Sequence, residues 1–159
     1  MTSKSERKRQ QLALQELGEK LIALKESELD ELTLDERLLK AIRDASGIKS
    51  HGALRRQKQL IGKLMREVDP EPIRAALARF TADDMHEKRL FASAEKWRDR
   101  LVSDGADAIE AFNTETGTDD PRLRKLLAEL EVAYDERSEK TVRRKIFRRV
   151  HEILVRIPQ

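Results

Sequence analysis

Apolar residues recur every three or four positions along most of this chain, which is the spacing of one face of an α-helix. Ser3 and Glu6 have capping-box spacing ahead of the first such stripe, which predicts a helix over residues 10–24. The stripe consists of Leu14, Leu17, Leu21 and Leu24. Alternation of apolar and polar residues never persists, so no segment is predicted to be a β-strand. The pattern therefore predicts an all-α fold.

Further helices are placed by the residues that start and end them. Thr33 and Glu36 repeat the capping-box spacing, and Gly47 is expected to end the helix that they open. The next helix is expected to end near Val68.

Two successive helices are expected in the middle of the chain. The first covers residues 69–80, because Asp69 can cap it and a proline takes the first helical position. The second runs from 81 to 104, with Thr81 at its start and Gly105 as the left-handed residue at its end.

The last part of the sequence is expected to contain three helices. They cover roughly residues 107–112, 121–130 and 141–156, with a loop over residues 113–120. The fold class is thus two small helical bundles joined by long helices. Residues 1–80 are the N-terminal bundle, with a strongly basic helix, and residues 81–159 are the C-terminal bundle, with a basic last helix.

Charge is nearly balanced over the whole chain but segregated along it. The 159 residues include 33 basic and 30 acidic side chains and no cysteine. The absence of cysteine excludes disulfides, thiolate nucleophiles and cysteine-ligated metals. No apolar run is long enough to span a membrane and no secretory signal is present, so we expect a cytoplasmic protein.

One basic helix is the most informative segment. Residues 49–66 contain six basic residues and no carboxylate. Their helical spacing places Leu54, Leu60, Ile61, Leu64, Met65 and Val68 on one side. The other side is expected to carry Arg55, Arg56, Gln59, Lys63 and Arg66, and Lys49 just before them is a further candidate contact. A solvated face normally mixes both signs, so a face of one sign indicates a polyanion such as nucleic acid. The alternative is a basic stripe balanced by an acidic patch elsewhere in the fold.

Gly62 lies among these basic positions and would let a partner's backbone approach closely.

The last helix is a second basic amphipathic helix, in which one face is rich in Val and Ile. Its other face carries Arg144, Lys145, Arg148, Arg149 and Arg156. This pattern has three interpretations: a helix that binds nucleic acid, a helix docked in the core for structural reasons, or a helix that lies on a membrane surface.

Catalytic chemistry has little support in the sequence. The histidines His51, His86 and His151 are isolated, and no metal-ligand or phosphate-loop spacing exists. We therefore expect no enzyme, no metal and no cofactor. Trp97 falls in the centre of an apolar stripe and is expected to be a core anchor, with stacking on a nucleobase as the alternative.

Four stretches resemble one known family, in its order and over most of the chain. They are SKSERKRQ at 3–10, LRRQKQLIGKLMR at 54–66 with DPEPIRAAL at 69–77, LFASAEKWRDRLVSDGADAIEAF at 90–112 and RRKIFRRVHEI at 143–153. The sequence is similar to the YjgA/DarP ribosome-associated proteins. Members often begin with an acidic extension, whereas this sequence starts almost at the SKSE motif. Lys58 occupies a position expected to be apolar in the family.

The resemblance implies a non-catalytic bacterial protein that promotes late maturation of the large ribosomal subunit near the peptidyl transferase centre. The implied partners are precursors of that subunit, its ribosomal RNA (rRNA) and ribosomal proteins, without a membrane or a small-molecule substrate. Carried over by position, the leading rRNA contacts are Arg55, Arg56, Gln59, Lys63 and Arg66. A second group consists of Lys4, Arg7, Lys8 and Arg9.

Two other functions remain open at this stage. A helical protein–protein adaptor would use the basic faces to meet acidic proteins, and it would bind a defined protein partner without RNA. A general nucleic-acid-binding protein would bind duplex DNA and rRNA with similar affinity.

Overall fold

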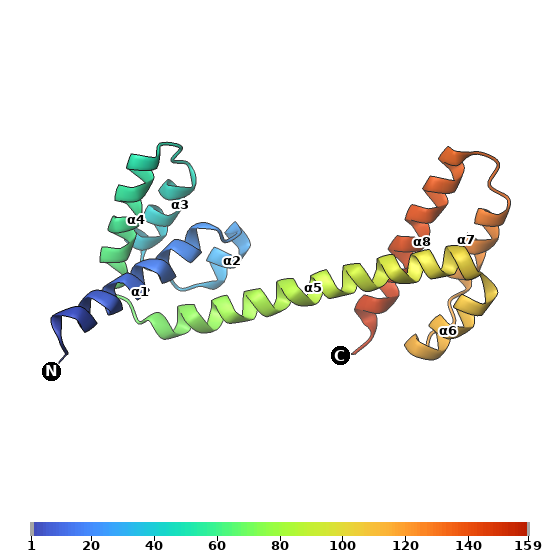
Figure 1. Ribbon diagram of the computed structural model, residues 1–159, viewed down its shortest axis with the longest axis horizontal. Helices are drawn as coiled ribbons and strands as arrows, with labels where there is room; N and C mark the ends of the chain where they lie inside the picture. Colours follow the sequence, from blue (N-terminus) through green and yellow to red (C-terminus); the bar gives the residue numbers. More distant parts are fainter. Residues whose placement is uncertain (1, 159) are drawn as a thin grey trace. The chain divides into compact units, whose positions relative to one another are not determined.

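The computed structural model describes residues 2–158, which form eight helices and no strand, so the predicted all-α class is confirmed (Figure 1). In chain order the helices are α1 (Lys4–Ile22), α2 (Glu26–Glu31), α3 (Glu36–Ser46), α4 (His51–Met65), α5 (Pro70–Asp104), α6 (Ala106–Thr116), α7 (Pro121–Glu131) and α8 (Glu136–Arg156).

Two compact units meet within α5. One extends to Ala82 and the other begins at Asp83, and each has its own buried core. The separation into domains 1–80 and 81–159 stays a prediction, because α5 runs through both units without a break.

Close contact between α1 and α4 organises the first unit (Figure 1). Gly18 lies against two fully buried side chains of α4, and a Cβ added to it would come within 2.6 Å of Ile61 Cγ2 and 2.9 Å of Met65 Cγ. A Cβ added to Gly62 would come within 2.9 Å of Gln15 Cβ. Gly62 is therefore buried in the crossing of α1 and α4, and its expected place on the basic face is wrong.

The acidic segment that follows α1 forms a helix that the sequence did not predict. Glu26 of α2 pairs with Arg43 of α3, and Glu31 of α2 pairs with Arg79 of α5 at 2.5 Å. These surface ion pairs join α2 to α3 and to α5.

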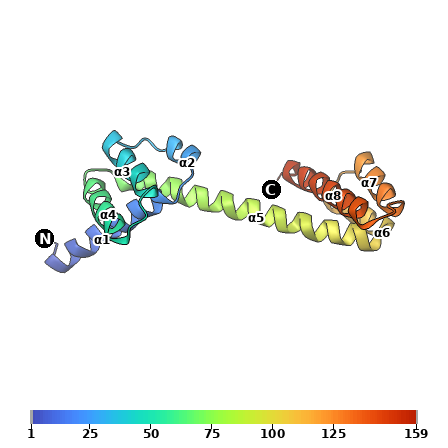
Figure 2. The ribbon, with the colours of Figure 1, turned by 90° about the horizontal axis from the view of Figure 1, so that it is seen from above.

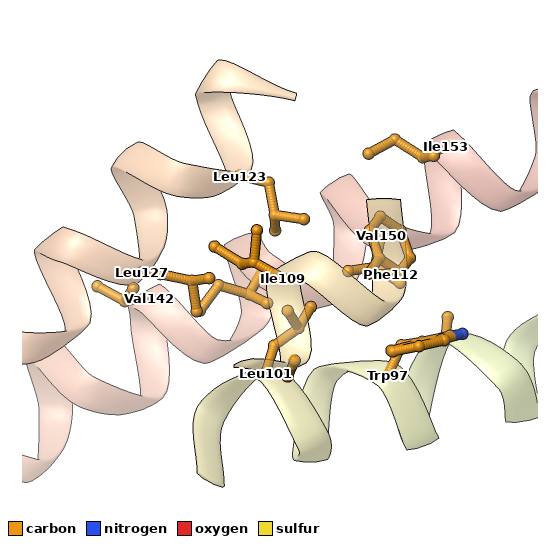
Figure 3. Close-up of a cluster of buried hydrophobic side chains, with 12 residues drawn as sticks. Trp97, Leu101, Ile109, Phe112, Leu123, Leu127, Val142, Val150 and Ile153 are labelled. Carbon is orange, nitrogen blue, oxygen red and sulfur yellow. The ribbon is translucent and has the colours of Figure 1, made fainter. Parts of the chain in front are cut away.

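The second unit packs α6, α7 and α8 against the C-terminal part of α5 (Figure 3). Trp97 is only 6% exposed and packs edge-on against Phe112, with 5.1 Å between ring centroids. This burial confirms the core-anchor reading of Trp97. The alternative, stacking on a nucleobase, is wrong because the ring is enclosed.

Several helix boundaries differ from expectation, among them the start of α1 at Lys4 rather than near residue 10 and the end of α4 at Met65 rather than near Val68. Thr81 does not open a helix, because its hydroxyl donates to the Leu77 carbonyl at 2.9 Å from within α5. The cap of α3 is Asp35 rather than Thr33. The last helix starts at Glu136 and not near 141, since the Asp135 side chain accepts a hydrogen bond from the Ser138 amide at 2.6 Å.

The loop expected over residues 113–120 is shorter than predicted. Helix α6 continues to Thr116 and ends at Gly117, whose φ of +66° is the left-handed conformation that glycine adopts freely. Gly105 also has a positive φ, 56°, at the junction of α5 and α6, but its ψ of −119° lies outside the left-handed helical region that was expected there.

Candidate nucleic-acid interface

A basic face of α4 is the main candidate site of the first unit. Ile61, Leu64 and Met65 fix the orientation of α4 because they are buried in the core. The opposite side of the helix is exposed and carries the predicted residues Arg55, Arg56, Gln59, Lys63 and Arg66, with Lys49 exposed just before the helix. Among the described residues, none of the cations on this face forms an ion pair.

Leu60 departs from the predicted apolar side of this helix. Its side chain is 42% exposed, because the core contacts of α4 centre on Ile61 and Met65 and the stripe is narrower than the sequence suggested.

The N-terminal turns of α1 extend this basic surface. Arg66, which caps the C-terminus of α4, donates to the Gln11 side chain at 3.4 Å, whereas Gly62 packs on Gln15, so the two helices run antiparallel. The turns that precede Gln11 therefore lie beyond the C-terminal end of α4. They carry the exposed predicted residues Lys4, Arg7, Lys8 and Arg9.

Lys58 is less exposed than the other cations of α4. It is half-buried, and together with Glu19 and His51 it lines a hollow of about 280 Å³ between α1 and α4, although Arg55 lines the same hollow. Lys58 therefore lies at the border between the buried side of α4 and its exposed basic side.

A second basic surface lies in the other unit, where α7 and α8 run side by side (Figures 1 and 2). A groove of about 310 Å³ between them is lined by Arg122, Lys125, Leu126, Lys145, Arg148, Arg149 and Glu152. The predicted residues Lys145 and Arg148 are exposed, as is Arg144 on the same helix. Sequence reasoning missed Arg122 and Lys125, because only the packing of α7 on α8 brings them to this groove.

Arg149 is held by the protein itself. Its side chain is 16% exposed, and its guanidinium donates through Nε to Asp120 Oδ2 at 2.9 Å, through Nη2 to the same oxygen, and through Nη1 to Glu152 at 2.8 Å. It is the one predicted cation that forms an ion pair within the described residues.

The carboxylate that binds Arg149 is also the cap of α7. Asp120 is 7% exposed and accepts a hydrogen bond from the Leu123 amide at 2.9 Å. Burial favours the neutral acid, but hydrogen bonds from Arg149 and Leu123 outweigh it and lower the pKa of Asp120 below its usual value of 3.8. Asp120 is therefore ionised at neutral pH and fixes the start of α7 relative to α8.

Within residues 2–158, no three His, Asp or Glu side chains gather as a metal site. None of the helices that the structure describes is long and apolar enough to cross a membrane. The described part of the chain does present an all-helical scaffold with exposed basic helix faces in both units.

The chain belongs to the DarP family. The family model described as dual-action ribosomal maturation protein DarP matches residues 1–151. The protein of that name from Nitrosomonas eutropha is 42% identical over 81% of this chain and 73% of its own length. The one from Edwardsiella ictaluri is 47% identical over 79% of this chain and 68% of its own length.

Proposed function

We propose that this protein is a ribosome maturation factor that binds precursors of the large ribosomal subunit through rRNA. The observation that carries the proposal is the face of α4, where several exposed cations have no carboxylate partner among the described residues. Membership of a family named for ribosomal maturation selects the ribosome among possible polyanions. The site of action would be the cytoplasm, near the maturing peptidyl transferase centre.

Backbone recognition is the expected mode of binding. The deep, narrow major groove of A-form RNA is closed to side chains, so cations on a helix face would neutralise phosphates rather than read sequence. Arg55, Arg56, Gln59, Lys63 and Arg66 would be the leading contacts, with Lys49, Lys4, Arg7, Lys8 and Arg9 beside them. In the second unit the contacts would be Arg144, Lys145 and Arg148, joined by Arg122 and Lys125, while Arg149 would act chiefly by holding α7 against α8.

Catalysis is not part of the proposed mechanism. A protein that binds the mature arrangement of an rRNA segment more tightly than its misfolded alternatives shifts the population toward that arrangement. Binding energy alone does this, without making or breaking a bond.

The proposal is tested by sedimentation of purified large-subunit precursor particles with the protein at several salt concentrations. The test variant is Arg55→Gln/Arg56→Gln/Lys63→Gln. If all three side chains contact phosphates, the slope of log affinity against log salt should become shallower by roughly 2 to 3.

A matched control removes the same charge from cations that do have partners. Lys40→Gln/Lys88→Gln/Lys140→Gln removes three exposed lysines that pair with carboxylates one helical turn away. This control should keep the wild-type slope. If the salt slope became shallower by the same amount in both variants, net charge alone would determine binding, and the proposal that α4 is the interface would be refuted. A wild type that stays at the top of the gradient at low salt would refute the ribosomal function and favour the adaptor.

Competition with duplex DNA separates the remaining alternative. A general nucleic-acid-binding protein would be displaced from the particles by DNA about as well as by rRNA, whereas the proposed factor would be displaced more readily by rRNA than by DNA.

A further inference from the structure

The loop between α7 and α8 exposes two large apolar side chains. Val132 is 78% exposed and Tyr134, the chain's only tyrosine, is 89% exposed. Every other exposed large hydrophobic residue in the described part of the chain is at most 54% exposed. Two such residues within three positions are more than the scattered single exposures expected of any surface.

The conformation of this loop is fixed from both sides. The Ala133 amide donates to the Leu130 carbonyl at 3.2 Å, which continues the last turn of α7. On the other side, Asp135 caps α8 through the Ser138 amide. The tyrosine is therefore presented by an ordered turn, which reduces the entropy lost when a partner binds it.

The charges around the loop select the class of partner. Residues 126–136 contain four carboxylates and no basic residue. Glu136 pairs with Lys140 at 2.8 Å, which leaves Glu129, Glu131 and Asp135 without an ion pair among the described residues. Phosphates would be repelled here, although the groove between the same two helices is basic. A polypeptide rich in Lys and Arg would be attracted, and tyrosine offers such a chain both apolar area and a face for cation–π contact.

We infer that the α7–α8 loop, with Val132 and Tyr134 at its tip, is a docking surface for a basic polypeptide segment of the ribosomal particle. This inference rests on the proposed function for the identity of the particle. The hairpin of α7 and α8 would then bind RNA along its groove and protein at its loop.

Two variants with opposite predictions for RNA and protein test the inference. Val132→Ser/Tyr134→Ser should weaken binding to intact precursor particles by roughly tenfold, as for loss of an aromatic anchor, and leave binding to protein-stripped rRNA unchanged. Glu129→Lys/Glu131→Lys should also weaken binding to particles. If RNA occupies the loop, the same charge reversal would tighten binding, and the inference would be overturned.

Exposed apolar residues elsewhere in the second unit provide the control. Met85→Ser/Val155→Ser removes side chains that are 51% and 54% exposed, and it should bind particles like the wild type. If the loop variant also binds like the wild type, the inference fails while the proposed function stands. If the wild type does not bind particles, the proposed function fails first.

Photo-crosslinking identifies the occupant directly. With p-benzoylphenylalanine in place of Tyr134, irradiation on purified particles should give an adduct to a Lys- and Arg-rich stretch of a particle protein. An adduct to RNA, an adduct to a second copy of this chain, or a yield no higher than with the same residue in place of Met85 would each overturn the inference.

Discussion

Replacing Asp120 by Ala should lower the free energy of unfolding by about 3 kcal/mol, because one buried side chain both caps α7 and binds Arg149. Loss of the cap accounts for about 1 kcal/mol. Loss of one partner from a fully buried ion pair costs about 3–5 kcal/mol. The pair here should contribute less, about 2 kcal/mol, because Arg149 is 16% exposed and keeps Glu152.

A second substitution at the same position separates the two roles. Asp120→Asn keeps an oxygen that can accept from the Leu123 amide, and it removes only the negative charge. It should therefore lose about 2 kcal/mol, with the cap retained. Urea unfolding followed by circular dichroism at pH 7 measures both values.

A double-mutant cycle tests the pairing itself. Arg149→Met keeps the apolar stem of the side chain, and combining it with Asp120→Asn should give a coupling energy of about 1–2 kcal/mol. Arg148→Met is the matched control, since its exposed side chain forms no ion pair among the described residues. The reasoning is refuted if the coupling is below about 0.5 kcal/mol, or if Arg148→Met destabilises the protein as much as Arg149→Met.

Two further outcomes follow from other parts of the structure. Gly18→Ala should destabilise the protein by about 1–3 kcal/mol, because the added Cβ would overlap Ile61 and Met65. Gly52→Ala has open space around the added Cβ and should stabilise the protein by up to about 1 kcal/mol. The midpoints of urea unfolding distinguish the two outcomes. Because folding lowers the pKa of Asp120, its ion pair contributes fully above the unfolded value of 3.8 and is lost as pH falls through the lower folded value. The stability difference between wild type and Asp120→Asn should therefore disappear in that acid range, and a difference that persists would contradict the assignment.

Helical periodicity in the sequence was sufficient to predict the fold class and the exposure of the α4 face. The helix boundaries were predicted wrongly where a residue can form either of two local hydrogen bonds of similar energy. Thr81 can cap a helix or donate back to a carbonyl one turn earlier, and only tertiary packing around the continuous helix decides. Asp135 was likewise overlooked as a cap because no apolar residue follows it within α8 until Val142.

The position of Gly62 shows a limit of the helical wheel. The wheel gives the angle of each residue around α4, but it cannot tell which edge of the polar face is covered by another helix. Here α1 covers the edge that contains Gly62 and half-buries Lys58, while Arg55 and Lys63 remain exposed. The exposed basic face of α4 is therefore smaller than the sequence alone predicted, because contact with α1 covers one edge of it.

Two neighbouring arginines show how the structure divides the predicted interface. Arg148 and Arg149 differ by one position in a basic run, and composition treats them alike. The side chain of Arg149 donates to Asp120, 29 residues away in sequence. This ion pair stabilises the fold only while both partners remain in contact and shielded from water. The side chain of Arg148 lines the groove without a carboxylate partner among the described residues, so a phosphate can bind it without breaking a contact of the fold. A cation that already stabilises the protein must give up that energy to bind RNA. For this reason the unpaired cations of α4 and of the α7–α8 groove are better suited to the interface than the equally basic Arg149.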